Sequence, residues 1–152
     1  MRSDIEKIIH QYYAAGEYVH PFQNIQFRGL KKTIRERRRI YDLIGELRSK
    51  VERKMEHVAL GEDTLAEMMR FHDGAITLRL SFLGSFAHVG LLHAQSMVEV
   101  ERGILIGKIY SVLEKFECLP LTEAERNEVV PWLTWQSREV TVGQCLFGKE
   151  EE

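Results

Sequence analysis

The hydrophobic positions recur at helical spacing over one long stretch, from about residue 28 to residue 60. At a turn of about 100° per residue, the apolar side chains of this stretch gather on one side of a helix. They are Leu30, Ile34, Ile40, Tyr41, Ile44, Leu47, Val51, Met55 and Val58. The pattern predicts one long amphipathic helix over about 28–60, and it favours a mainly α protein, a helical bundle built on that helix.

Shorter helices are expected on both sides of the long one. Ser3 is a suitable N-cap for a first helix, and Gly16 is a suitable residue to end it. Another short helix is predicted over 62–72, where apolar side chains fall on one side. These elements would supply the apolar faces against which the long helix packs.

The C-terminal part of the chain gives two weaker signals. Thr122 and Glu125 have the spacing of a capping box, which predicts a short helix to about Val130. Residues 135–147 are rich in β-branched and aromatic side chains, so a short strand or an extended arm is expected there. The acidic tail, 149–152, is expected to fray.

Residues 75–117 fit two periods at once. The apolar positions from Ile76 to Phe82 alternate with polar ones, which is typical of a strand. A helical period also starts at Ile76 and continues to Phe116, and this longer match is favoured. Glycines interrupt it, so two or three helical pieces are predicted, with breaks near Gly84 and Gly103.

The strand pattern leaves a second fold class open for the same region. In this alternative the protein is α+β, with an antiparallel meander over 75–112. Met97–Glu101 and Ile104–Ile109 would then pair across the Arg102-Gly103 turn. The sequence therefore favours the helical bundle and keeps the meander as its rival.

Length and composition indicate one domain over residues 1–152, because the chain has 152 residues and 44% of them are hydrophobic. Cys118 and Cys145 are too few for a disulfide framework, which indicates a reduced, cytoplasmic compartment. No secretory signal or membrane span is expected. The most apolar run, 75–98, is interrupted by Arg79 and is better explained as a buried core segment.

Charge is distributed unevenly along the chain. Residues 28–39 carry a net charge of +6, although the whole chain carries −2, so the remainder carries −8. On the predicted helix six of the seven cations of this segment fall within an arc of roughly 120°. They are Arg28, Lys31, Lys32, Arg35, Arg38 and Arg39. Such a face is a candidate site for a phosphate backbone or an acidic protein, and it is also what a solvated, ion-paired helix surface looks like.

Candidate chemistry is sparse. His88 and His93 are five residues apart, which places them on diverging sides of a helix, and His20 has no second carboxylate–histidine pair to complement it. The two cysteines have no CxxC spacing, so both are interpreted as core residues. No phosphate-binding glycine loop or nucleophile elbow occurs, and we therefore expect no catalytic residue, metal or cofactor.

Two tryptophans stand out near the C-terminus. Trp132 and Trp135 are three residues apart and follow Pro131. If they are exposed they are interface candidates, because tryptophan is enriched at binding hot spots. If they are buried they close the core over the last helix.

The first functional hypothesis is a small, non-enzymatic, cytoplasmic regulatory or assembly subunit. It would bind another protein, or form a homo-oligomer, through apolar faces of its amphipathic helices. The alternative is a nucleic-acid-binding protein that lays the basic face, 28–39, along phosphates without reading bases. No membrane partner is expected.

Overall fold

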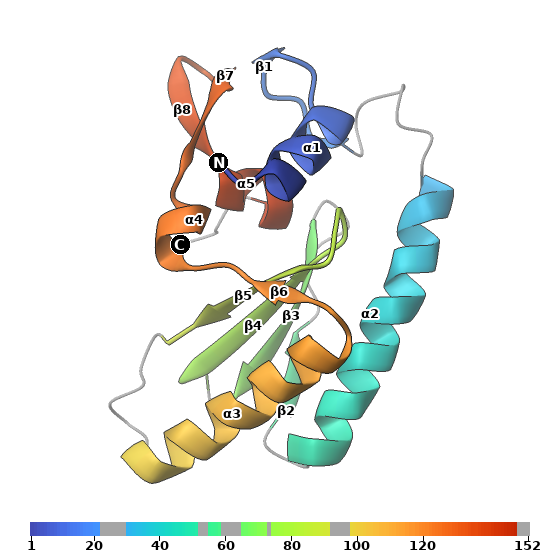
Figure 1. Ribbon diagram of the computed structural model, residues 1–152, viewed down its shortest axis with the longest axis vertical. Helices are drawn as coiled ribbons and strands as arrows, with labels where there is room; N and C mark the ends of the chain where they lie inside the picture. The colour runs from blue at the N-terminus through green and yellow to red at the C-terminus, as the bar shows by residue number, and fades with distance from the viewer. Residues whose placement is uncertain (22–29, 52–54, 59–64, 73, 92–97, 149–152) are drawn as a thin grey trace.

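The architecture is α+β, so the predicted helical bundle is wrong (Figure 1). This computed structural model describes residues 1–21, 30–51, 55–58, 65–72, 74–91 and 98–148, and within 30–37 it describes the backbone only. In those residues the chain forms five helices and two mixed sheets. The elements are α1 (Ser3–Tyr12), β1 (Gly16–Glu17), α2 (Leu30–Val51), β2 (Met55–Val58), β3 (Ala66–Phe71), β4 (Ile76–Ser81), β5 (Phe86–Gly90), α3 (Glu99–Lys115), β6 (Leu119–Pro120), α4 (Glu123–Arg126), β7 (Val129–Trp135), β8 (Arg138–Thr141) and α5 (Val142–Phe147).

The larger sheet has five strands in the order β2-β3-β4-β5-β6. The first four are antiparallel neighbours, while β6 pairs parallel to β5 after the crossover helix α3. Helices α2 and α3 lie side by side against one face of this sheet (Figure 1). Leu47 of α2, Leu78 of β4 and Ile109 of α3 are fully buried in the core between the layers.

A second core fills the other end of the molecule. The smaller sheet, in the order β1-β7-β8, packs there with α1 and α5 (Figure 1). A two-residue turn joins β7 to β8, and both of its residues, Gln136 and Ser137, have positive φ (48° and 64°). That is the geometry of a type I′ hairpin turn, which matches the twist of the strands it connects. The Tyr13 hydroxyl donates a hydrogen bond to the Cys145 carbonyl at 2.6 Å and so joins α1 to α5.

The long helix is confirmed over its central part but not over its predicted length. Helix α2 ends at Val51, and the residues from Met55 to Val58, predicted to be its last turns, form β2 instead. Tyr41, expected on the apolar side, is half exposed, and its hydroxyl donates to Glu67 at 3.3 Å. The buried stripe of α2 is therefore narrower than predicted, and it ends where the chain turns into the sheet.

The prediction of a short helix over 62–72 is also wrong. Residues Ala66–Phe71 form β3, which is inserted between β2 and β4. Met69 and Phe71 face the helices, while Ala66 and Met68 are buried on the opposite face of the sheet. A strand buried on both faces has no polar–apolar alternation, and short apolar runs of this kind are easily mistaken for a helix.

Between residues 75 and 117 both predictions fail in part. The alternating positions form β4, and β5 follows as its antiparallel neighbour, so the predicted helical pieces are wrong over these strands. The meander is wrong after β5, because the helix α3 occupies Glu99–Lys115, and this helix also continues through Gly103, where a break was predicted.

The C-terminal predictions did better. The capping box is confirmed: the Thr122 side chain accepts from the Glu125 N–H, and the Glu125 carboxylate accepts from the Thr122 N–H. The helix it starts is short and ends at Arg126. The segment 135–147 contains the end of β7, the strand β8 and then α5, and the acidic tail lies outside the described residues.

Candidate functional site

The structure places the predicted basic face on α2 but describes only its end. Arg28 lies outside the described residues, and of Lys31, Lys32 and Arg35 only the backbone is described. The side chains of Arg38 and Arg39 are exposed. The sequence prediction of the basic helix is thus confirmed for its backbone from Leu30 onward.

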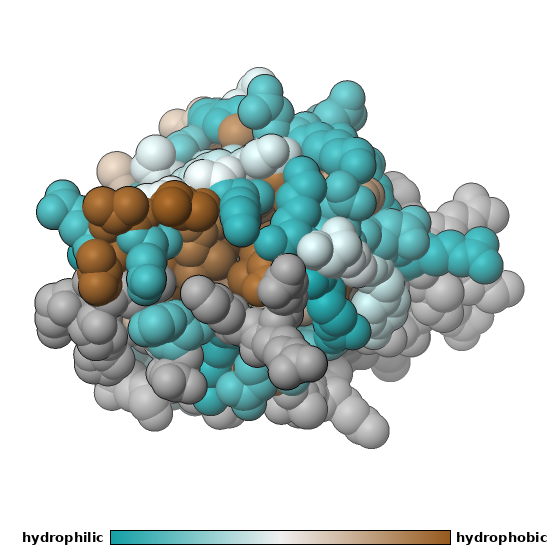
Figure 2. Space-filling model, turned by 90° about the horizontal axis from the view of Figure 1, so that it is seen from below, coloured by the Kyte–Doolittle hydropathy of each residue, from teal (hydrophilic) through white to brown (hydrophobic). Residues whose placement is uncertain are grey.

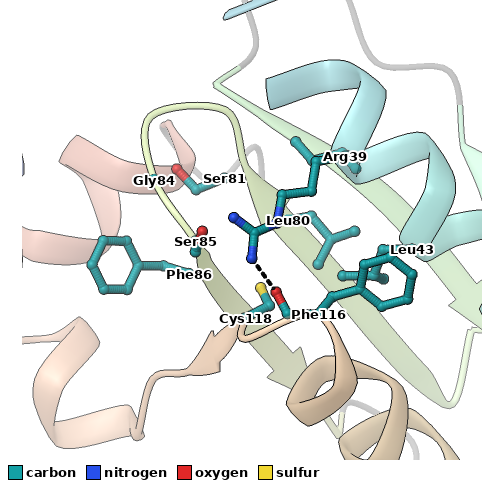
Figure 3. Close-up of a pocket in the computed structure, with 10 residues that line it drawn as sticks. Arg39, Leu43, Leu80, Ser81, Gly84, Ser85, Phe86, Phe116 and Cys118 are labelled. Carbon is teal, nitrogen blue, oxygen red and sulfur yellow. Dashed lines mark hydrogen bonds between the residues drawn. The ribbon is translucent and has the colours of Figure 1, made fainter. Parts of the chain in front are cut away.

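Arg39 reaches across to the end of α3. Its Nη2 atom donates to the Phe116 carbonyl at 2.6 Å (Figure 3). The same nitrogen lies 3.9 Å from a carboxylate oxygen of Glu117. This arginine therefore supports the turn after α3, where Glu117 has a positive φ of 53°. One of the two described arginines of the basic face has a structural role as well as an exposed surface.

Beside Arg39 lies a small cleft between α2, the bend before β5 and the start of β6 (Figure 3). It encloses about 60 Å³, which is room for a few water molecules. The Cys118 thiol contributes to its lining, but burial raises the pKa of this thiol to about 12. A thiol with that pKa is protonated at neutral pH and is a poor nucleophile, so the cleft offers no thiolate chemistry.

Helix α3 carries three large apolar side chains that are exposed, Val100, Ile104 and Tyr110. Leu105, Ile109 and Leu113 point into the core, as the helical spacing requires. On the other side of the same helix, Val100 is 70% and Ile104 is 56% exposed. Figure 2 shows apolar side chains gathered on the lower side of the molecule, where α3 lies in Figure 1.

We call this surface the α3 face and define it by the residues that point outward on successive turns. They are Val100, Gly103, Ile104, Gly107, Tyr110 and Ser111, all of them exposed. Tyr110 is 43% exposed, and Val98, the residue before the first residue of the helix, is 64% exposed. At both glycines an added Cβ would meet no atom within 4 Å, so the middle of the face is open.

Sequence reasoning missed the α3 face because the helix is apolar on both sides. The helical period from Ile76 to Phe116 follows one apolar side of this segment, and on α3 only that side is buried. The available signal was the pair Val100 and Ile104, which lies opposite Leu105 and Ile109 on a helical projection.

The interface candidates Trp132 and Trp135 are partly buried against the second core. The ring of Trp132 stacks on His10, with centroids 4.3 Å apart and planes 8° from parallel. Its indole nitrogen is buried and has no hydrogen-bond partner among the described residues. The two tryptophans, both on β7, therefore pack against the second core more than they project from the surface.

A cluster that the sequence did not suggest lies between β2, β3 and α2. His57 Nε2 is 2.7 Å from one oxygen of Glu67, and the other oxygen accepts from Tyr41. An imidazole held by a carboxylate can act in acid–base chemistry. Among the residues that the structure describes, no three His, Cys, Asp or Glu side chains gather closely enough to hold a metal ion.

The remaining histidine predictions and the membrane prediction can also be placed. His88 lies on β5, with its ring 6.0 Å from that of Phe147, whereas His93 lies outside the described residues. Within the described ranges, no helix has the length and apolarity that crossing a membrane requires.

Comparison with protein-family models, with curated proteins and with solved structures finds no match to this chain.

Proposed function

We propose that this chain is a non-enzymatic protein-docking module, an assembly or regulatory subunit of the cytoplasm, and that it binds its partner through the α3 face. The observation that carries the proposal is the exposure of Val100 and Ile104 on adjacent turns of a helix whose other side is core. Single exposed apolar residues are ordinary, but contiguous exposed apolar patches mark interaction sites.

The shape of the face supports this role. Two open glycine positions, Gly103 and Gly107, lie between the larger side chains of Val100, Ile104 and Tyr110. Small residues let another backbone approach closely, and larger ones provide apolar area to bury. Helix-in-groove and helix-on-helix docking both use such a surface. The cytoplasmic setting is supported by the two free, buried cysteines.

The test is the apparent mass of the chain in an extract of the cells that make it, measured by native gel filtration. The wild-type chain should elute above the 17.7 kDa of a monomer. Ile104→Asp should move it toward the monomer position, because a charge placed in a buried apolar contact is strongly unfavourable. Val19→Asp is the matched control, since Val19 is also exposed (46%) but lies far along the chain, beside β1. A monomer-sized wild type, or equal shifts for the two variants, would refute the docking function.

A second candidate is nucleic-acid binding by the basic face, favoured by the cation density of residues 28–39 and the exposure of Arg38 and Arg39. Such binding would weaken steeply with salt, because each phosphate contact releases counterions. Reversing Lys32, Arg35 and Arg38 to glutamate should abolish it while circular dichroism stays unchanged. Arg39 is left in place because it holds the Phe116 carbonyl. Salt-insensitive binding, or none at low salt, would exclude this candidate.

A further inference from the structure

We propose that the partner of the α3 face is a second copy of this chain, docked so that the two α3 helices pack antiparallel about a two-fold axis. The inference rests on the proposed docking function and names its partner. Most soluble homo-oligomers are closed by such symmetry, and a two-fold interface requires a surface that is complementary to itself. The α3 face has this property in its shape and in its charge.

The shape argument starts from spacing. Val100, Ile104, Gly107 and Ser111 point outward at intervals of four, three and four residues, which is the seam spacing of packed helix pairs. If the two-fold axis passes between residues 105 and 106, Ile104 lies opposite Gly107 of the second copy. Val100 then lies opposite Ser111. A large side chain faces a small one at every level, so the helices can approach closely without leaving voids.

On the first flank of this seam a large side chain again faces a small one. Gly103 and Tyr110 lie on the same side of the seam, seven residues apart. In the antiparallel pair, the tyrosine of each copy lies across the glycine of the other. At Gly103 an added Cβ would meet no described atom within 4 Å, so this position can be approached by the ring of a second copy. The polar end of the ring stays at the rim, as is usual for tyrosine at interfaces.

The second flank supplies the charge complementarity. Glu101 and Lys108 lie together on this side and are both exposed. Antiparallel pairing brings Glu101 of one copy near Lys108 of the other, and the symmetry makes this contact twice. The Lys108 ammonium makes one long hydrogen bond, 3.4 Å, to the Lys50 carbonyl, and its other N–H donors can serve the carboxylate.

Orientation follows from the same charges. Helix α3 begins with two acidic residues, Glu99 and Glu101, and ends with Lys115. A parallel pair would bring the acidic starts of both helices together and align their dipoles. An antiparallel pair instead places each acidic start beside the basic half of its neighbour and opposes the dipoles. The charge pattern therefore selects the antiparallel arrangement.

The test is the molar mass of the purified full chain, measured by light scattering after gel filtration from about 5 to about 500 µM. The wild type should be a dimer at every concentration of this range, because the same complex has to persist at the lower concentration of an extract. Ile104→Asp should raise the dissociation constant by at least about 30-fold, as expected for a central hot spot. Val19→Asp should leave it unchanged. A wild type that stays monomeric throughout would overturn the inference.

Charge exchange tests the orientation. Glu101→Lys and Lys108→Glu should each weaken the dimer by roughly fivefold to tenfold, because like charges replace opposite ones. The double variant, Glu101→Lys with Lys108→Glu, should restore dimerisation to near the wild-type level. Failure of the double variant to recover would overturn the antiparallel register.

A second steric variant guards against misfolding of the first. Gly107→Leu fills the space opposite Ile104, and in the monomer a Cβ at this position would meet no described atom within 4 Å. It should abolish the dimer with unchanged circular dichroism, and a dimer that persists would count against the inference. A pure chain that is monomeric, together with an extract complex that Ile104→Asp disrupts, would overturn the second-copy partner and leave the docking function standing.

Discussion

The Ser81 hydroxyl donates a hydrogen bond to the Leu146 carbonyl at 2.5 Å, which joins the end of β4 to α5 across 65 positions of sequence. The same oxygen accepts from the Leu83 N–H at 3.1 Å. Ser81 is 3% exposed, so water cannot replace either bond. One buried hydroxyl thus connects the five-stranded sheet, the bend that follows β4 and the second core.

Removing this hydroxyl should destabilise the fold. We expect Ser81→Ala to lower the free energy of unfolding by about 1–3 kcal/mol, because it leaves a buried carbonyl and a buried N–H without partners. Chemical denaturation followed by circular dichroism measures the change. Ser49→Ala is the control, since that hydroxyl is exposed and should contribute less than about 0.5 kcal/mol. Equal losses for the two variants would contradict the linking role of Ser81.

The capping box of α4 should make stability depend on pH in the acid range. The Thr122 N–H donates to the Glu125 carboxylate and is the main cause that lowers the pKa of this group below 4.5. A lowered pKa in the folded state adds stability above the ordinary glutamate pKa, and that stability is lost as the pH falls through the folded value. Glu125→Gln should therefore flatten the fall in unfolding free energy below about pH 4.5.

Thermal melting of Glu125→Gln and of Glu123→Gln over the same pH series provides the comparison. Glu123 is an exposed residue of the same helix, so its replacement controls for the loss of a charge near a helix start. If Glu123→Gln flattened the acid limb as much as Glu125→Gln does, the assignment to the capping carboxylate would be wrong.

Replacing Gly103 and Gly143 by alanine should change the free energy of unfolding in opposite directions. Gly103 lies on the open α3 face, where an added Cβ meets nothing within 4 Å, so Gly103→Ala should stabilise the folded monomer by about 0.5–1 kcal/mol. At Gly143 a Cβ would lie 2.5 Å from Cγ and 3.1 Å from the carbonyl oxygen of Arg126. Gly143→Ala should destabilise by about 1–3 kcal/mol through overpacking. Unfolding curves at a low, fixed concentration check both, and a destabilised Gly103→Ala would show that the α3 face is not open.

The sequence predicted an element correctly where polar residues alternate regularly with its apolar residues, and failed where they do not. The central part of α2 and the α4 capping box were predicted correctly, because Ile40 to Val51 keep a helical period and Thr122 and Glu125 bond locally. Strand β3 was missed because Met68 and Met69 are buried on opposite faces, which erases the alternation. The sheet order depends on contacts between distant residues, which no local pattern encodes.

The candidate site was predicted less well. The basic face was identified from charge alone, but the bond from Arg39 to the Phe116 carbonyl spans 77 positions and could not be inferred from it. The α3 face was hidden because α3 carries apolar residues on two opposite sides, and the sequence does not show which of the two is buried. The structure shows which side of α3 faces solvent: the helix lies in the outer layer, it packs one side against the sheet, and Ile104 is on the other side.

The two cysteine thiols should be unreactive in the folded protein. Burial raises the pKa of Cys118 and of Cys145 to about 12, so almost no thiolate exists at pH 8. Ellman's reagent should therefore release no colour from the native chain and about two equivalents after unfolding in guanidinium. Rapid reaction of one native thiol would show that its site is open and would return a nucleophilic cysteine to consideration.

The most direct measurement is photo-crosslinking from the α3 face itself. A benzophenone amino acid in place of Ile104, introduced in the cells that make the protein, should form a protein adduct on irradiation, because residue 104 lies inside the docked surface. The antiparallel pair predicts an adduct of twice 17.7 kDa that contains two copies of the chain. The same probe at Val19 should give none. Absence of any adduct at residue 104, or equal adducts at both positions, would contradict the claim that this face of α3 is where the protein is bound.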